Sequence, residues 1–134
     1  MIVEEIAEYL TSEGLGTFDA TGITGDIFIE TMPDSPDVAI GLFTTGGLAP
    51  DVSTSVSRPR VQLIVRGGRD PREAAALAAQ IYEALHGLRS MEFISGGTRI
   101  MLCSAVQSGA IRLGPDDNGR HEYSINLQLI TGGD

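Results

Sequence analysis

One stretch of the sequence, residues 60–88, constrains the fold more than any other. It opens with Val61, Leu63 and Val65 at alternate positions. This spacing is typical of a strand that turns one face inward, because successive side chains of a strand point to opposite sides. The two glycines that follow, Gly67 and Gly68, predict that the strand ends there.

The same stretch then carries the clearest helix start in the chain. Asp70 is a suitable N-cap, Pro71 suits the first helical position, and Glu73 stands at the third. The helix is predicted to run to about His86 and to close at Gly87. Its inward stripe is expected to hold the larger apolar residues Leu77, Ile81 and Leu85. A strand followed by such a helix predicts a helix layer packed on a sheet.

Four further strands and one further helix are predicted. An amphipathic helix is expected over residues 2–13, with Gly14 as its left-handed stop. Residues 99–107 are apolar at both odd and even positions, which predicts a central strand covered on both sides. The other strands are predicted by alternation at 27–29, 38–43 and 122–130.

The predicted fold class is α+β, in a single domain that spans residues 1–134. It comprises a mixed or antiparallel sheet of about five strands, with an N-terminal helix and a long central helix packed on it. A chain of 134 residues is long enough for one core and too short for two. Residues 44–59 are the longest segment without a period, and we treat them as a candidate contact arm. Asp116 to Gly119 is a hairpin-turn signal.

The charge balance argues against a nucleic-acid-binding protein. The formal net charge is -9, and all nine basic residues are arginine. An acidic chain with scattered arginines is poorly suited to binding DNA phosphates. Because no run approaches the 18–20 apolar residues that cross a bilayer, no membrane span is expected. The first residues lack a secretory pattern, so we expect synthesis in a cytoplasm.

The residues available for catalysis or metal binding are few. The single cysteine, Cys103, excludes an intrachain disulfide, and with only two histidines a structural zinc site is not expected. Nothing in the sequence brings Cys103 together with His86 or His121, as nucleophilic catalysis requires. No enzyme is therefore predicted, and no catalytic, cofactor-binding or metal-binding residue is assigned.

Two short motifs resemble ligand-binding loops, but neither matches the full pattern that such a loop requires. Gly14 to Phe18 is glycine-rich, but it follows a predicted helix, whereas phosphate loops follow a strand and open a helix. Asp116 to Gly119 resembles part of a calcium loop, but the twelfth position falls on Ile125 where an EF-hand needs glutamate. Both are interpreted as turns.

Taken in order, several segments resemble the siphophage minor capsid proteins that act as tail terminators. Each segment alone is weakly specific, whereas their shared order and spacing extend over nearly the whole chain. The segments are Ile2–Leu10, Gly14–Gly16, Asp26–Ile29, Met32–Asp37, Thr45–Gly47, Val61–Gly67, Ala79–Leu88 and Gly119–Asn126.

The resemblance implies a structural virion protein at the head–tail joint. Such proteins assemble as a ring, for which a hexamer is expected. The ring caps the head-proximal end of the tail tube, stops tube growth and meets the head connector. The expected partners are therefore copies of the chain itself, the tail tube protein and a head-completion or connector protein. DNA is expected to pass through the lumen without specific binding.

Physical reasoning then suggests which segments make these contacts, because a ring joins two different patches of neighbouring subunits. A long loop is suited to reach a neighbour, and an exposed hairpin tip is suited to line the lumen or to meet the connector. The candidate assembly contacts are Gly46, Gly47, Asp51, Arg58, Arg60, Asp116, Asp117 and Arg120.

Other functions remain open on the sequence alone. A head-completion or tail-completion adaptor would share the fold, and only its place in the particle would separate it from a terminator. A small ligand-binding or enzymatic α+β domain would need a pocket with convergent polar groups. A DNA mimic is suggested by charge alone.

Overall fold

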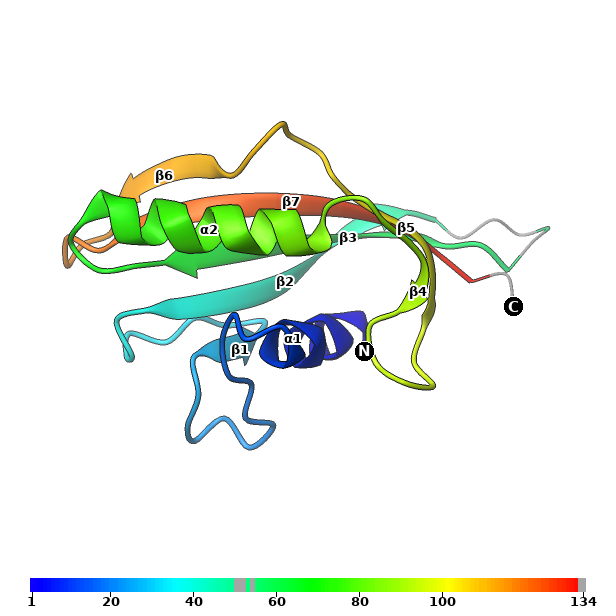
Figure 1. The fold of residues 1–134 in the computed structure, drawn as a ribbon, viewed down its shortest axis with the longest axis horizontal. Helices are drawn as coiled ribbons and strands as arrows, with labels where there is room; N and C mark the ends of the chain where they lie inside the picture. Colours follow the sequence, from blue (N-terminus) through cyan, green and yellow to red (C-terminus); the bar gives the residue numbers. More distant parts are fainter. Residues whose placement is uncertain (50–52, 54, 133–134) are drawn as a thin grey trace.

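The protein is a two-layer α+β domain in which one face of a seven-stranded sheet is covered by two helices (Figure 1). The computed structural model describes residues 1–49, 53 and 55–132. The elements, in chain order, are α1 (Ile2–Ser12), β1 (Ile27–Ile29), β2 (Ala39–Leu48), β3 (Arg58–Arg66), α2 (Pro71–Leu85), β4 (Leu88–Glu92), β5 (Arg99–Ala105), β6 (Ile111–Pro115) and β7 (His121–Thr131).

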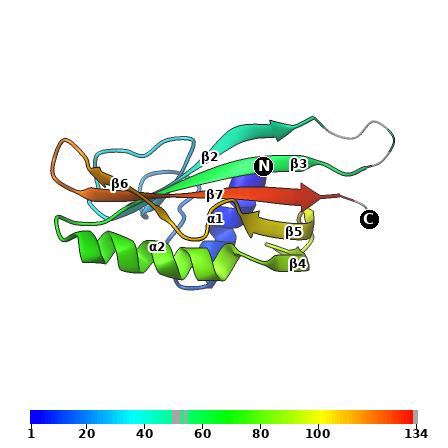
Figure 2. The same ribbon diagram turned by 90° about the horizontal axis from the view of Figure 1, so that it is seen from above.

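The sheet is mixed, and β7 lies at its centre. The strand order is β1-β2-β3-β7-β5-β4, and β6 pairs with β7 as well. Only β1 and β2 run parallel, while the other pairs are antiparallel. β7 pairs along one edge with β3, and along the other edge first with β6 and then with β5 (Figure 2). The α+β class and the mixed sheet are confirmed, whereas the prediction of about five strands is wrong, because β4 and β6 were missed.

Residues at the ends of the two helices determine where α2 begins and where α1 ends. At α2, the side chain of Asp70 accepts a hydrogen bond from the Arg72 N–H at 3.0 Å, so the predicted cap is confirmed. Gly14, after α1, has a φ of 76°, as predicted for a left-handed stop. The expectation of one long central helix needs correction. α2 has 15 residues and lies mainly over β7, while α1 covers β1 and β2.

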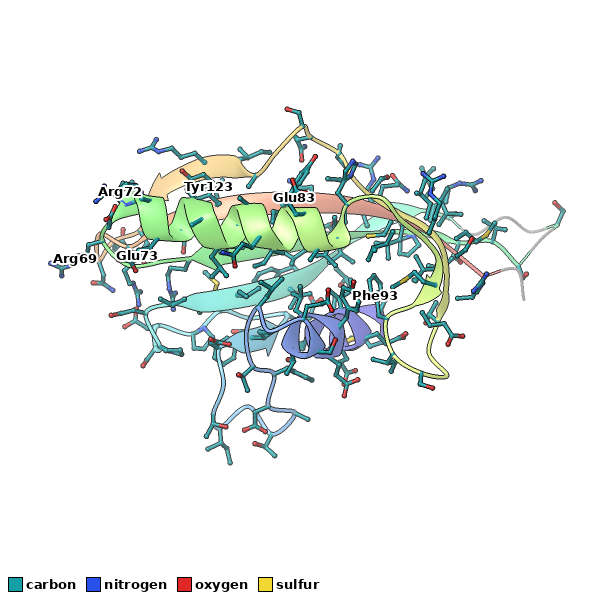
Figure 3. The ribbon with its side chains drawn as sticks, in the orientation of Figure 1. Arg69, Arg72, Glu73, Glu83, Phe93 and Tyr123 are labelled. Carbon is teal, nitrogen blue, oxygen red and sulfur yellow. The ribbon has the colours of Figure 1, made fainter. Side chains whose placement is uncertain are left out.

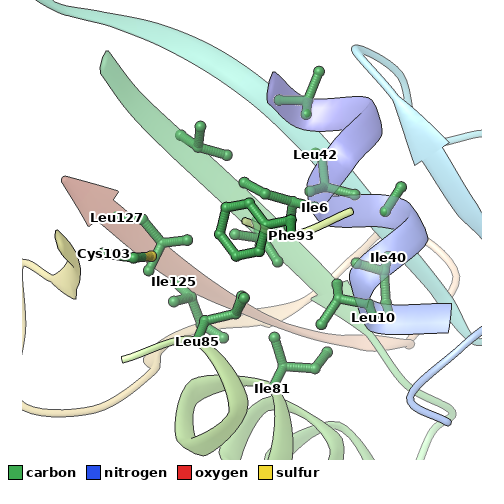
Figure 4. Close-up of a cluster of buried hydrophobic side chains, with 14 of the residues drawn as sticks. Ile6, Leu10, Ile40, Leu42, Ile81, Leu85, Phe93, Cys103, Ile125 and Leu127 are labelled. Atoms are coloured by element: carbon green, nitrogen blue, oxygen red, sulfur yellow. The ribbon is translucent and has the colours of Figure 1, made fainter. Parts of the chain in front are cut away.

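The core lies between the helices and the sheet. Alternate residues of β2, β3 and β7 point to the helices, and so do the inward stripes of α1 and α2 (Figure 4). Ile81 and Leu85 of the predicted α2 stripe are fully buried, and Leu77 is partly buried. Burial of each such side chain stabilises the fold by about 1.5–3 kcal/mol. The largest fully buried side chains are Ile6, Leu10, Ile27, Ile40, Leu42, Leu63, Ile81, Leu85, Ile100, Ile125, Leu127 and Leu129.

Two predictions about individual segments are wrong. Residues 44–59 are not one irregular loop, because β2 continues to Leu48 and β3 begins at Arg58. β5, predicted from residues 99–107, is not covered on both sides. It is the second strand from the edge, and Met101 is 43% exposed. The run of apolar residues suggested two covered faces because a bulge between Ile100 and Leu102 places an extra apolar residue on the strand.

Candidate assembly surface

The sheet has an open face, opposite the helices. Arg58 and Arg60 lie on this face, and the other described candidate contacts lie in the hairpins at its two ends. We define the open face by the outward-pointing residues of β3 and β7, among them Arg60, Gln62, Ser124, Asn126 and Gln128. Their neighbours at alternate positions lie in the core. Neither α1 nor α2 covers this face.

Two buried arginines hold a loop across one end of the open face. Arg66 is 3% exposed, and its guanidinium donates to the carbonyl oxygens of Pro33, Pro36 and Asp37 at 2.7–2.9 Å. Arg120, 6% exposed, donates to the backbone carbonyl of Asp34 and to its carboxylate. Because a guanidinium carries five donors, each arginine satisfies several groups of a loop that has no regular structure of its own.

The β6–β7 hairpin tip is part of the same cluster. The Asp116 carboxylate accepts from the Asn118 N–H, the Arg120 N–H and the Arg120 guanidinium at 2.9 Å each. Burial opposes ionisation of this carboxyl, but these hydrogen bonds outweigh it and lower the pKa of Asp116. Asp117, by contrast, is exposed. Among the candidate contacts at this tip, only Asp117 therefore presents a side chain that the described part of the chain leaves unengaged.

At the opposite end of the sheet, the β2–β3 hairpin carries the other candidate contacts. Gly46 and Gly47 have φ values of 84° and 121°, and a bulge separates Thr44 from Gly47. A Cβ at Gly47 would overlap the backbone carbonyl of Arg58 on the facing strand. Glycine is therefore required where the hairpin twists. Asp51 lies outside the described residues.

The middle of the open face is a layer of hydrogen-bonded polar side chains. Gln62 and Asn126 both donate to the Ser124 hydroxyl, at 3.0 and 3.2 Å. Arg60 donates from Nε to the Gln128 side-chain oxygen at 2.9 Å. The bonds of Arg60 and Gln62 cross from β3 to β7, whereas that of Asn126 lies within β7. Together they fix the side chains in place on a surface without a covering layer.

Beyond this polar layer, arginines and apolar side chains share the open face. Register places Arg58, Ile130, Leu102 and Arg89 in one row across β3, β7, β5 and β4. Arg60 and Arg89 are exposed, while Leu102 and Ile130 are half-buried. The sequence identified Arg58 and Arg60 but missed Arg89, because β4 carries no strand signal strong enough to place it on the sheet.

The residues considered for catalysis do not form a nucleophilic site. Cys103 is fully buried in the core, and burial raises the pKa of its thiol to about 12. His86 is exposed, stacks on Tyr82, and accepts a hydrogen bond at Nδ1 from the Ala105 N–H at 2.9 Å. His121 opens β7, where its backbone bonds to Gly67 and Gly68. A thiol with this pKa and no exposure is not a nucleophile at neutral pH.

The described surface carries several open clefts of about 300–660 Å³. One of about 370 Å³ lies between the start of α1 and residues 18–33. Asp19 lines it, and hydrogen bonds from Thr24 and Thr21 hold the pKa of that carboxyl well below its usual range. Within the described ranges, no group of three or more His, Cys, Asp or Glu side chains is placed to hold a metal ion. No helix of the described chain is long and apolar enough to cross a membrane.

Comparisons with known proteins give the family. The chain matches the family model described as bacteriophage tail terminator protein over residues 9–131. No curated protein matches it. Among solved structures, a chain of the virion of a native gene transfer agent particle has a TM-score of 0.67 at 15% identity, with coverage of 98% of this chain and 94% of that chain. The protein therefore belongs to the bacteriophage tail terminator family, whose members are structural proteins of the phage tail.

Proposed function

We propose that this chain forms a ring on the head-proximal end of a phage tail tube, where it stops tube polymerisation and joins the tube to the head connector. The observation that carries the proposal is the family match over residues 9–131. A homo-hexamer is the expected ring. The tail tube protein and a head-completion or connector protein are the expected neighbours, and the head–tail joint of the virion is the expected location.

Two features of the fold support an assembly role over a catalytic one. The core is filled by apolar side chains, and the two ends of the open face carry differently built surfaces. A ring of identical subunits needs such unlike patches, because each patch meets a different patch of its neighbour. The non-enzymatic role is part of this proposal, since a groove such as that beside Asp19 has room for a small ligand.

The β2–β3 hairpin and the β6–β7 tip are proposed as contacts with the tube or the connector. They lie at opposite ends of β7, because β3 and β7 are antiparallel (Figure 2). Asp117 is the proposed contact at the tip. Asp116 and Arg120 support it from inside by fixing the turn and its loop. Gly46 and Gly47 shape the other hairpin.

The net charge of -9 supports passage of DNA through such a ring without binding. Like-charged walls repel the phosphate backbone, so the duplex gains no stable contact. Appreciable affinity of the assembled ring for duplex DNA at physiological salt would contradict this part of the proposal.

The terminator role is tested by adding the purified protein to growing tail tubes and measuring tube length by electron microscopy. We expect shorter tubes, each with an extra ring at one end, and no effect on tube diameter. Imaging of the head–tail joint in intact particles then separates the two assembly roles. A ring on the last tube ring supports a terminator. A ring seated only on the portal side supports the adaptor alternative and overturns termination.

A further inference from the structure

The basic residues of this chain are confined to its later part. The first 57 residues contain ten acidic residues and no arginine or lysine, whereas all nine arginines fall between Arg58 and Arg120. The helix α1 therefore carries acidic side chains without any arginine, whereas Arg58, Arg60 and Arg89 belong to the later strands β3 and β4.

The outward face of α1 is the acidic surface. Glu4 and Glu8 are exposed one turn apart, and Glu13 is exposed just after the helix. The other outward side chains of the helix, Thr11 and Ser12, are small and uncharged. No arginine or lysine lies in α1, so the stripe presents carboxylates alone beyond the chain's own amino terminus.

The arginine row of the open face is the basic surface. Arg58 and Arg89 lie in this row and Arg60 lies beside it, two residues along β3, and no carboxylate of the described residues pairs with them. The nearest acidic residue in the register, Glu92, stands opposite Arg99 at the end of β4 and leaves these three arginines uncompensated. In a chain of net charge -9, a positive patch of this kind calls for a negatively charged occupant.

We propose that the α1 stripe of one copy packs on the arginine row of the next copy, as the contact that builds the ring. The inference rests on the ring of the proposed function and names its surfaces. Each copy carries both surfaces, on opposite layers of the domain, so the contact is head-to-tail and can close on itself.

The length of the helix matches the length of the row. The 11-residue helix is roughly 16 Å long. The row from β3 through β7 and β5 to β4 crosses three strand spacings, about 14 Å.

The composition of the row favours a protein occupant over a nucleic acid. Half-buried Leu102 and Ile130 separate the arginines, and Leu48, paired with Arg58, is 64% exposed. Arginine beside apolar side chains is typical of protein interfaces. The second helix is less suited to meet the row, because Arg72 and Glu73 at its start give α2 an outward face of mixed charge (Figure 3).

Charge reversal tests the contact. The sheet variant carries Arg58→Glu and Arg89→Glu, and the helix variant carries Glu4→Arg and Glu8→Arg. Sedimentation velocity over a concentration series is expected to show that each variant alone assembles more weakly than the wild type, by more than about ten-fold in apparent dissociation constant. An equimolar mixture restores assembly, because every contact then joins opposite charges. All four positions are at the surface, so thermal melts should stay close to wild type.

Matched controls reverse charges outside the two surfaces. Arg112→Glu on β6 and Glu83→Arg on α2 alter exposed residues of the same types. We expect wild-type assembly for both. Disulfide trapping gives a second readout, since a chain with Glu8→Cys and Arg89→Cys should form a ladder of covalent oligomers. The native Cys103 does not interfere, because it is buried.

The outcomes distinguish this contact from the ring itself. If both charge variants assemble like the wild type and the cysteine pair gives no disulfide ladder, the proposed contact is wrong. The ring itself is not affected by that result. A wild-type chain that neither assembles nor caps tubes overturns both. If the sheet variant still assembles but loses an affinity for duplex DNA that the wild type has, the arginine row binds DNA, and the inference is wrong.

Discussion

Glu5 offers the sharpest test of how the N-terminal helix is fixed to the sheet. It lies on α1 between exposed Glu4 and Glu8, yet it is only 9% exposed. Its carboxylate accepts from the Thr98 N–H at 2.7 Å and from the Thr98 hydroxyl at 2.8 Å. Replacement by alanine therefore leaves a backbone N–H without its acceptor and releases the β4–β5 connection from α1.

The size of the effect follows from these two bonds. A hydrogen bond to a charged group contributes about 1.5–3 kcal/mol. Both bonds end on Thr98 and are not independent, so we expect Glu5→Ala to lower the free energy of unfolding by about 2–4 kcal/mol. With an unfolding entropy of about 2.1 cal/mol/K per residue, this corresponds to a fall in Tm of roughly 7–14 °C for a chain of this length.

Circular dichroism melts at neutral pH measure the change. Glu5→Gln keeps one oxygen for the Thr98 N–H and should lose about half as much. Glu8→Ala, on the exposed side of the same helix, should shift the free energy by less than about 0.5 kcal/mol. Faster hydrogen exchange at the Thr98 amide in Glu5→Ala would locate the loss. If Glu5→Ala and Glu8→Ala melt within about 2 °C of each other, the two bonds do not hold the helix, and the reasoning is refuted.

Three further predictions concern the hairpins and the core. Gly47→Ala should destabilise the fold by about 2–4 kcal/mol in urea unfolding, because its Cβ would overlap the facing strand; Gly46→Ala, with nothing within 4 Å, should cost about 1 kcal/mol. Equal costs would contradict this. Cys103 should resist a thiol reagent at pH 8 in the native state and react at once in denaturant, because its pKa is raised to about 12; rapid native labelling would contradict its burial. The folded-state pKa of Asp116 is lowered, so its stabilising effect is present above the unfolded pKa and is lost as the pH falls. Asp116→Asn should therefore make the free energy of unfolding less dependent on pH in the acid range, and an unchanged pH dependence would contradict the hydrogen-bonded turn.

The helix α2 could be predicted because its signals are local. Its cap, proline and apolar stripe all lie within one stretch of sequence, and no distant residue is needed to read them. β4 and β6 are different. Each has five residues and no clear alternation, so each becomes a strand only through pairing with β5 or β7. Strands that depend on a partner carry little signal of their own.

The candidate site shows the same division between local and distant information. Arg58 and Arg60 were found because they lie at the end of the segment treated as a contact arm and at the start of the predicted strand that follows it. The burial of Arg66 and Arg120 was not, because the loop that covers them comes from residues some 30 and 86 positions away. The burial of Glu5 could not be predicted for the same reason, since its partner Thr98 lies 93 positions further along. Burial of a charged side chain depends on such partners. Because they are distant in the sequence, the residues next to the charged side chain do not reveal them.

The position of β7 has a consequence for how the sheet forms. β7 follows the other six strands in chain order, and it pairs with β3 across 68 positions at Arg60 and Gln128. Until β7 has paired, β3 and β5 have unpaired edges, which are prone to join the edges of other chains. Folding is therefore dominated by long-range contacts, so it is expected to be slow. A chain truncated before His121 should aggregate, and truncation by even a few strand residues should reduce the yield of soluble subunits available for assembly.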